Sequence, residues 1–319
     1  MMMMMMMMEL LKGDCLIESD KIESGSVDLI LTDLPYGTIK GMGGDIEKYK
    51  RLSNSDWDNV IDTNKIMQIA NRILRKNGKM VLTANQPFTT ELISKAIPNL
   101  PHNYNMYWDK MHFANCLVAN KAPVSYIEDV LIFSKGDCYN AVHPLKNVMK
   151  KYESIYGRGK IVNLFLNEGR YKSANSAIVH ASYKFGYGKG MRFDLMNEKM
   201  YNYLSDFIYF KETFEELKKI DDEYKIKYCS TFNLWEGNKY KSNILKYKKE
   251  YNGHHPTQKP VLLLEDLIKT FSNESDLVVD LTMGSGSTGV AAKNTNRNFI
   301  GIEQDDKYFN IASERINNG

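Results

Sequence analysis

The sequence predicts an α/β fold in which one sheet is assembled from both ends of the chain around an inserted region. Segments typical of strands and helices alternate in residues 9–136, and the same alternation returns in residues 251–319. Between them, residues 137–250 lose that regularity and are rich in Tyr, Asn, Lys and Gly. Strand–helix alternation on both sides of an insert indicates a single parallel sheet to which both flanking segments contribute.

Expected elements follow from the pattern of apolar residues. Residues 27–32 form a nearly continuous apolar run, as in a strand buried on both faces. Apolar side chains then recur at helical spacing over residues 62–76, and Asn77-Gly78 ends that helix. Further strands are expected at 79–83, 104–108, 130–133, 277–280 and 298–302, and further helices at 206–220, at 259–271 with Thr257 as its cap, and from 289 to 294.

Composition excludes several classes of protein. Hydrophobic residues make up 43% of the 319 residues and charged residues 25%, an ordinary globular balance. No stretch approaches the roughly 20 apolar residues of a membrane span, so we expect no membrane association and a cytoplasmic location. The four cysteines form no CxxC pair, which disfavours a disulfide framework and a thiolate zinc site. His254-His255 has no third ligand at a helpful spacing, so no metal is expected.

Residues 1–8 are a run of methionine. No basic stretch precedes the run and no small-residue cleavage site follows it, which argues against a signal peptide. We interpret it as a disordered tail outside the fold.

Positive charge is concentrated in the insert. The net charge of the chain is only +3, yet residues 137–200 carry eleven Lys and Arg against five acids, with tyrosine and phenylalanine interleaved. Basic and aromatic side chains together suit a polyanion such as nucleic acid. A solvated, lysine-rich surface is the alternative interpretation.

A glycine-rich loop follows the expected strand at 277–280. Gly284, Gly286 and Gly289 have GxGxxG spacing and open a helix, and Glu303 ends the next strand, where an acid can bind ribose hydroxyls. Asp280, just before the glycines, would repel a pyrophosphate but attract the ammonium and sulfonium of S-adenosylmethionine. Charge therefore favours S-adenosylmethionine over NAD, and a tight turn without a ligand is the structural alternative.

A second candidate site lies at the carboxyl end of the first strand, where open α/β sheets place their chemistry. There the chain reads Asp33-Leu34-Pro35-Tyr36. Taken alone, this tetrapeptide is better explained as a strand-to-turn exit, because Asp, Pro and Gly37 all favour turns, and it is the glycine loop that reverses this preference.

Together these segments resemble the DNA amino-methyltransferases. The tetrapeptide is similar to their Asp-Pro-Pro-Tyr motif, with Leu34 in place of the first proline, and residues 280–289 resemble their cofactor loop. Residues 255–260 and 299–303 resemble two further signatures. The order of catalytic motif, insert and cofactor motif is that of the circularly permuted beta subclass, in which the insert is the target-recognition region. The resemblance covers roughly 9–136 and 253–319.

The resemblance also implies residue roles. Asp33 and the Leu34 carbonyl would accept hydrogen bonds from the target amine, Pro35 would stiffen the turn, and Tyr36 would stack on a base flipped out of the duplex. Phe88 could form another wall of that pocket, or pack in the core. The implied cofactor-binding residues are Asp14 and Cys15 near the adenine, His255, Thr257, Gln258, Lys259 and Pro260 near the methionine part, Asp280, Gly284, Ser285, Gly286, Ser287 and Thr288 in the loop, and Glu303 at the ribose.

The expected activity is site-specific methylation of adenine N6 in double-stranded DNA, with S-adenosylmethionine as methyl donor. An aspartate at position 33 favours adenine as the target base, because cytosine-N4 enzymes more often carry Ser there. Cytosine N4 is the alternative target. Cytosine-C5 enzymes need a Pro-Cys nucleophile that is absent here, and protein glutamine methyltransferases have Asn in place of Asp33. The alternative function of an NAD-dependent oxidoreductase would not explain the tetrapeptide. A DNA-binding protein that had lost its catalytic activity should also have lost Asp33 or the glycines. Further partners to consider are a separate restriction endonuclease and a second copy of the chain.

Overall fold

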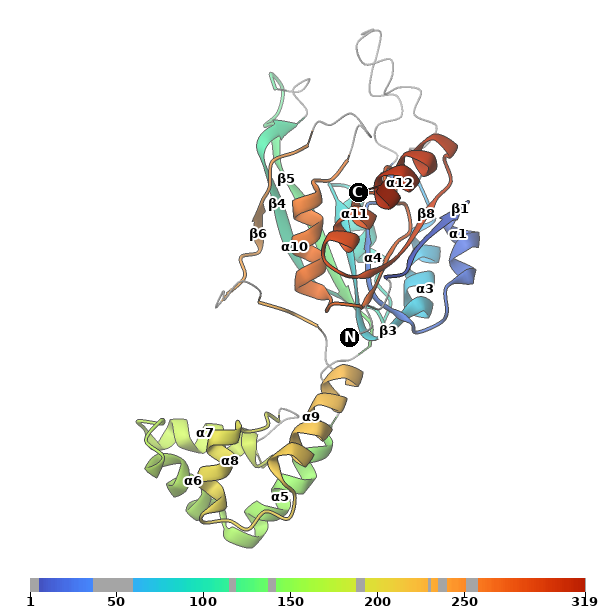
Figure 1. Ribbon diagram of the computed structural model, residues 1–319. Helices are drawn as coiled ribbons and strands as arrows, with labels where there is room; N and C mark the ends of the chain where they lie inside the picture. The colour runs from blue at the N-terminus through green and yellow to red at the C-terminus, as the bar shows by residue number, and fades with distance from the viewer. Residues whose placement is uncertain are drawn as a thin grey trace. The chain divides into compact units, whose positions relative to one another are not determined.

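The computed structural model describes residues 6–36, 60–114, 119–136, 142–187, 193–228, 231–234, 240–250 and 258–318. The chain divides into two compact units, of which unit 1 comprises residues 1–136 and 230–319 and unit 2 residues 137–229 (Figure 1). The predicted insert was to end at residue 250. Unit 2 ends about twenty residues earlier because residues 244–246 form a strand of the sheet in unit 1.

Unit 1 is built on an eight-stranded sheet with the order β1-β8-β7-β2-β3-β5-β4-β6. In chain order these are β1 (Met8–Lys12), β2 (Val27–Thr32), β3 (Leu74–Ala84), β4 (His102–Ala114), β5 (Ser125–Ser134), β6 (Ile244–Lys246), β7 (Leu277–Asp280) and β8 (Asn298–Glu303). Both ends of the chain contribute to the sheet, as predicted: β2 lies between β3 and β7, and β1 pairs with β8.

The sheet is mixed, whereas the sequence predicted a parallel one. Within it β5 alone runs opposite to its neighbours, pairing antiparallel with both β3 and β4. The reason is the connection between β4 and β5, residues 115–124, which is too short for the crossover of a dozen or more residues that parallel neighbours need.

The first strand begins inside the methionine run. The Met7 amide donates to Asn298 Oδ1 at 2.8 Å, and Met8 opens β1 opposite Phe299. The prediction of a disordered tail over residues 1–8 is therefore wrong for Met7 and Met8, while residues 1–5 lie outside the described part.

Helices cover both faces of the sheet (Figure 1). Leu29 and Leu31 of β2 pack with α10 (Val261–Phe271), α11 (Ser287–Asn294) and α12 (Asp306–Asn318). Ile30 faces the other way, towards α1 (Cys15–Glu18), α3 (Thr63–Ile73) and α4 (Phe88–Ser94). This alternation buries β2 on both sides, as its apolar run predicted.

The boundary between α3 and β3 differs from the prediction. Asp62 caps α3 by accepting from the Asn64 amide at 3.0 Å, but the helix ends at Ile73 and not at residue 76. Leu74 is already extended and pairs with Val27 of β2. Pairing of this buried leucine with the sheet outweighs the helical spacing of the apolar residues before it.

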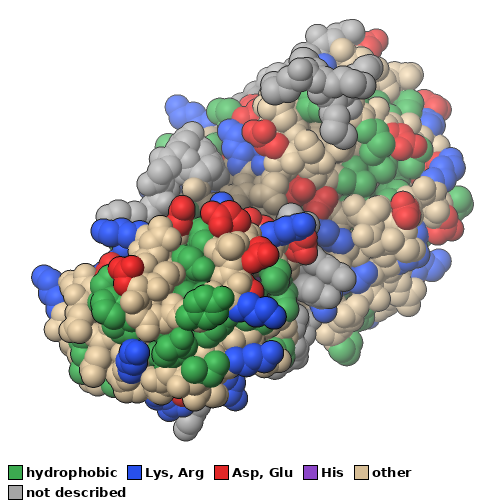
Figure 2. Space-filling view, turned by 60° about the horizontal axis from the view of Figure 1, so that its bottom comes forward, with side chains coloured by type: hydrophobic (Ala, Val, Ile, Leu, Met, Phe, Trp, Pro, Cys, Tyr) green, Lys and Arg blue, Asp and Glu red, His purple; other side chains and the backbone are tan. Residues whose placement is uncertain are grey.

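Unit 2 is helical and has its own core. Its helices are α5 (Pro144–Tyr156), α6 (Arg158–Asn167), α7 (Ala174–Lys184), α8 (Glu198–Ser205) and α9 (Phe214–Tyr228). Phe165 and Phe185 are fully buried among its apolar residues. The sequence predicted only one helix here, at 206–220, whereas α9 begins at Phe214. On the one face of the molecule that Figure 2 shows, hydrophobic side chains lie among Lys and Arg side chains.

No helix in the described ranges is long and apolar enough to cross a membrane.

Candidate active site

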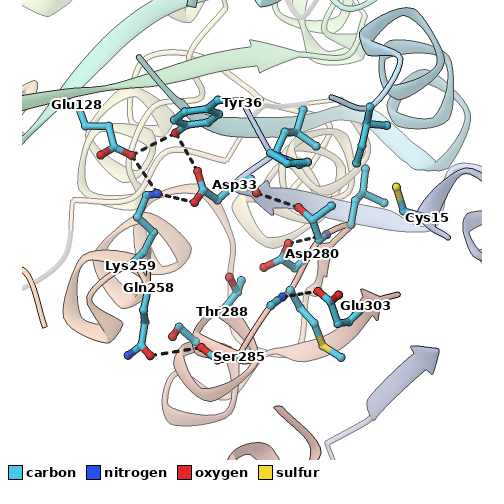
Figure 3. Close-up of a pocket in the computed structure, with 18 of the residues that line it drawn as sticks. Cys15, Asp33, Tyr36, Glu128, Gln258, Lys259, Asp280, Ser285, Thr288 and Glu303 are labelled. Carbon is cyan, nitrogen blue, oxygen red and sulfur yellow. Dashed lines mark hydrogen bonds and ion pairs between the residues drawn. The ribbon is translucent and has the colours of Figure 1, made fainter. Parts of the chain in front are cut away.

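A cavity of about 1000 Å³ opens in unit 1 where β2, β7 and β8 end. It is lined by residues 33–36 after β2, residues 280–285 at the end of β7, and Glu303 at the end of β8 (Figure 3). Because parallel neighbours end at the same edge of a sheet, the tetrapeptide and the glycine loop share one cavity although about 250 residues separate them.

Asp33 is held at three of its atoms. Its carboxylate Oδ1 accepts from the Tyr36 hydroxyl at 2.9 Å and from the Thr83 hydroxyl, and its Oδ2 is paired with the Lys259 ammonium. The Thr282 hydroxyl donates to the Asp33 main-chain carbonyl at 3.0 Å. These contacts fix the carboxylate in one orientation at the cavity wall.

Tyr36 lies between this carboxylate and an aromatic neighbour. Its ring centroid is 5.3 Å from that of Phe88, with the ring planes inclined at 38°. Burial, with Asp33 and Glu128 adding to it, raises the pKa of Tyr36 well above its usual value, so the phenol stays neutral and donates. Leu34 is buried in the core and Pro35 lines the cavity. Phe88 is 4% exposed in the core of unit 1 and is not among the residues that line the cavity, so the structure favours core packing over the pocket wall for this residue.

The strands β4 and β5 bring two charged residues that the sequence analysis missed. Glu128 of β5 contacts the Lys259 ammonium at 3.0 Å and the Lys110 ammonium of β4 at 3.2 Å, and accepts weakly from the Tyr36 hydroxyl at 3.3 Å. A signal existed, because Glu128 shares one strand face with the apolar Val130 and Ile132. An acid on an otherwise buried face is unusual and marks a candidate site.

Burial and charge compete in this group. Burial would raise the pKa of Glu128, but Lys259 and Lys110 outweigh it and hold the pKa below its usual value. Burial likewise opposes the charge of Lys259, but Asp33 and Glu128 raise its pKa above the usual range. The pKa of Lys249, which also lines the cavity, is lowered by burial and by the nearby Lys259 and Lys110.

The glycine loop connects β7 to α11 and is tied to β8. Gly284 and Gly286 have positive φ of 51° and 81°, a conformation that favours glycine. The Gly284 amide donates to Glu303 Oε2 at 2.9 Å, and the Asp305 amide donates to the other oxygen at 2.7 Å. The Ser285 hydroxyl contacts the Gln258 side-chain oxygen at 3.3 Å. Gln258 and Glu303 therefore lie against the loop, and these residues line one half of the cavity, here called the glycine-loop half.

Asp280 is 3% exposed and accepts from the Thr32 hydroxyl at 2.7 Å and from the Thr282 amide at 3.1 Å. Burial is the largest cause that raises the pKa of Asp280 to about 6, against the lowering effect of these hydrogen bonds. Burial raises the pKa of Glu303 as well. Two carboxylates in this half of the cavity are thus easier to protonate than usual.

The segment at Gly13 reaches the same half. The Gly13 amide donates to the Glu303 carbonyl at 3.0 Å, and Asp14 caps α1 by accepting from the Leu16 amide at 2.9 Å. Burial raises the pKa of Cys15 to about 12, which keeps the thiol protonated and unreactive.

The structure brings most of the predicted site residues together. The cavity is lined by Asp14, Cys15, Asp33, Leu34, Pro35, Tyr36, Gln258, Lys259, Asp280, Gly284, Ser285, Ser287, Thr288 and Glu303. Gly286 instead packs against Ala312 of α12, and Pro260 precedes α10. His255 and Thr257 lie outside the described residues. Lys259, expected near the cofactor, has its ammonium on the carboxylates of Asp33 and Glu128.

No group of His, Cys, Asp or Glu that could hold a metal ion occurs within the ranges that the structure describes.

Known proteins are similar to the chain in sequence and in structure. The DNA adenine methyltransferase YhdJ of Escherichia coli (strain K12) is 26% identical over 310 residues, which cover 96% of this chain and 82% of that protein. The Type II methyltransferase M2.LlaDCHI of Lactococcus lactis subsp. cremoris is 37% identical over 106 residues, or 33% of this chain. That match spans 36% of the Lactococcus protein, little more than a third of its length.

Among solved structures, M1.HpyAVI in complex with SAM is similar with a TM-score of 0.53. The likeness covers 98% of this chain and 100% of that one at 19% sequence identity, and so concerns the fold. The family model described as DNA methylase, for N6 and N4 methyltransferases, matches residues 27–314 and so contains the tetrapeptide, the charged residues of β4 and β5, and the glycine loop. The chain belongs to this DNA methylase family.

Proposed function

We propose that the protein transfers a methyl group from S-adenosylmethionine to the exocyclic N6 of adenine at a specific sequence in double-stranded DNA. The observation that carries this proposal is the position of Asp33, whose oriented carboxylate faces the same cavity as the glycine loop. Membership of the DNA methylase family supports the reaction class, and the similarity to a protein named DNA adenine methyltransferase supports the base.

The residues of the glycine-loop half fit S-adenosylmethionine. No Lys or Arg in the described part of the chain forms a salt bridge with the buried Asp280 or the half-buried Glu303, so a cationic ligand would supply the missing positive charge. Asp280 would attract the ammonium and sulfonium, and Glu303 would accept from ribose hydroxyls. The bound donor supplies an activated methyl group.

The residues of the tetrapeptide would prepare the acceptor. Asp33 and the Leu34 carbonyl would accept hydrogen bonds from the two N–H groups of the target amine, which keeps its lone pair directed at the methyl group instead of delocalised into the ring. Tyr36 would stack on the flipped base. The amine nitrogen would take the methyl group as the S–C bond breaks, S-adenosylhomocysteine would leave, and the methylated amine would give its extra proton to solvent. Catalysis on this scheme rests on positioning and on electrostatics.

Unit 2 is our candidate for the target-recognition region. Its supporting features are a separate helical core and the excess of Lys and Arg over residues 137–200. Replacing this unit with that of a relative should change the methylated sequence, and an unchanged sequence would count against the assignment. The order of tetrapeptide, insert and glycine loop supports placing the chain in the permuted beta subclass.

We further propose that the enzyme acts in the cytoplasm. The Type II name of the Lactococcus relative supports a restriction-modification setting, in which a separate protein cleaves DNA. A second copy of the chain is the other partner we propose.

The decisive experiment is mass spectrometry of nucleosides from unmodified plasmid DNA treated with the purified protein and S-adenosylmethionine. N6-methyladenine is the expected product. N4-methylcytosine would keep the site and mechanism but contradict the proposed base. Absence of any methylated nucleoside on DNA of diverse sequence, together with absence of cofactor binding, would contradict the proposed function.

A further inference from the structure

Four charged residues of alternating sign form a chain from the interior to the tetrapeptide, here called the charge ladder: Lys110, Glu128, Lys259 and Asp33. Lys110 contacts Glu128 at 3.2 Å. Glu128 contacts Lys259 at 3.0 Å, and Lys259 is paired with Asp33, as Figure 3 shows. Lys110, Glu128 and Lys259 are only 7%, 6% and 8% exposed. The ladder joins β4, β5 and the residues before α10 to the end of β2.

Stability alone does not account for the ladder. Burying ion pairs costs desolvation free energy that their attraction does not reliably recover, and apolar residues of similar volume are often as stable. What the ladder does supply is a fixed position for the last charge, because each group is held by the next. That last charge is Asp33, on which the proposed chemistry depends.

The hydrogen bonds of Asp33 show where a target amine can bind. An ionised carboxylate offers about four acceptor positions. Within the described residues, Tyr36 and Thr83 donate to Oδ1 and Lys259 donates to Oδ2. The remaining position is therefore on Oδ2, the oxygen that Lys259 holds.

We propose that Lys259 is a positioning residue that orients Asp33 for the target amine, and that Glu128 in turn holds Lys259 in place. This inference rests on the proposed function and deepens it. It assigns Lys259 to the half of the cavity that holds the tetrapeptide, and not to the glycine-loop half, where the cofactor is proposed to bind. Its neighbour Gln258 reaches the other half, where it contacts Ser285 at 3.3 Å. Two consecutive residues thus serve the two halves of one cavity.

The test measures the affinity for the cofactor and the rate of methyl transfer separately. Full-length Lys259→Met and Gln258→Ala are compared with wild type, with S-adenosylmethionine binding measured by calorimetry and methyl transfer by single-turnover kinetics at saturating cofactor and DNA. For Lys259→Met we expect the rate to fall about 10- to 100-fold, the loss typical of one charge-assisted hydrogen bond, with the cofactor Kd unchanged within about twofold. For Gln258→Ala we expect a higher Kd.

Two further variants control for charge and for general damage. Lys259→Arg keeps the positive charge and should recover most of the rate, whereas Lys269→Met removes a lysine from the helix that follows, at its partly exposed pair with Glu265, and should change neither quantity. Glu128→Gln keeps the shape of the side chain and should slow the rate with an unchanged Kd. Added to Lys259→Met, it should lower the rate little further, because both changes break one chain of contacts.

The opposite pattern overturns the inference. If Lys259→Met raises the cofactor Kd more than about tenfold and keeps its rate at saturation, Lys259 is a cofactor-binding residue. If Lys259→Met does not fold, Glu128→Gln decides, and a wild-type rate in that variant contradicts the positioning role. Failure of the wild type itself to methylate DNA would contradict the proposed function, and so is distinguishable from either result.

Discussion

At Asp33, three side-chain donors converge on one carboxylate, and two of them come from residues outside the tetrapeptide. Asp33→Ala removes the acceptor proposed for the target amine and leaves the glycine loop intact. We expect methyl transfer to fall at least about 100-fold while S-adenosylmethionine still binds, in keeping with the loss of one electrostatic group at a reacting centre. Single-turnover kinetics and calorimetry on the same preparation check both parts.

Asp33→Asn is the matched variant for that prediction, because it keeps the shape of the side chain but removes its charge. It should be slower than wild type and should bind the cofactor normally. Full activity in Asp33→Ala would contradict the mechanism.

Asp280 predicts a pH dependence of cofactor affinity. Its pKa is raised to about 6 chiefly by burial, and only the ionised carboxylate attracts a cation. The Kd for S-adenosylmethionine should therefore fall as pH rises through about 6 and level off above about pH 7. Calorimetry between about pH 5 and pH 8 measures this, and Asp280→Asn should bind more weakly and lose most of the dependence. A persisting dependence in that variant would assign it to another group, such as Glu303.

The same raised pKa affects stability in the opposite direction. The folded, cofactor-free protein keeps a proton on Asp280 up to pH about 6, whereas the unfolded chain releases it near the ordinary pKa of 3.8. The contribution of this group to stability therefore decreases as pH rises from about 4 to 6 and stays low above that. Asp280→Asn should gain urea resistance relative to wild type at about pH 7.5 but much less at about pH 5.

The site residues that could be predicted from the sequence are those that lie in local motifs. Asp33 to Tyr36 and the glycine loop are contiguous motifs at strand ends, so their place in one cavity followed from the fold class. Glu128 and Lys110 lie inside strands and act through residues far away in the chain. The pairing of β4 with β5 brings them together, and no short motif encodes it.

Among the elements, the turn from β7 into α11 leaves little room for a side chain at Gly286. A Cβ on Gly286 would lie 2.9 Å from Cα and Cβ of Ala312, and the residue has φ of 81°. Gly286→Ala should lower the free energy of unfolding by about 3 kcal/mol, from backbone strain and overpacking combined. Urea denaturation measures the change.

Gly25 provides the control for that substitution. Its φ is 74°, but no atom lies within 4 Å of the position that a Cβ would occupy there. Gly25→Ala should therefore cost only the backbone strain, about 1 kcal/mol. Equal effects of the two substitutions would show that the contact with α12 contributes nothing.

Sequence patterns predicted the existence of elements in unit 1 better than their direction or ends. All of the strands expected in residues 27–133 and 277–302 occur, but β5 runs antiparallel because its connection to β4 is short. The three-residue β6 carries too few residues for any periodicity, and its place beside β4 is set by tertiary packing.

At the scale of the whole molecule, we predict that a substitution in the core of unit 2 affects DNA methylation without affecting cofactor binding by unit 1. Phe165 is fully buried in the core of unit 2. Phe165→Ala should lower the stability of that unit by about 3–5 kcal/mol and reduce DNA methylation, while the cofactor affinity of unit 1 stays unchanged. Calorimetry and the methylation assay test the two effects, and an equal loss of cofactor binding would contradict the separation.

The helical nature of unit 2 was not evident from sequence. Its helices begin at polar caps such as Ser173 and Asn197, but few residues of these short helices are buried: Ala177 and Ala181 in α7, and Met200 and Leu204 in α8. Its boundary at residue 229 was also missed, because the charge and composition of residues 230–250 resemble those of the insert.

The pairing of β1 with β8 has a consequence during synthesis. Met8 faces Phe299 in the sheet, so the ribosome must add about 290 further residues before the first strand can meet its partner. At roughly 5–20 residues per second, β1 waits about 15–60 s. During that time Asp33 and Tyr36 have already been made, while Glu303 has not. On the proposed function, a chain that has not yet reached Glu303 would hold its tetrapeptide without the acid proposed for the methyl donor, and should methylate no DNA until β8 has been made.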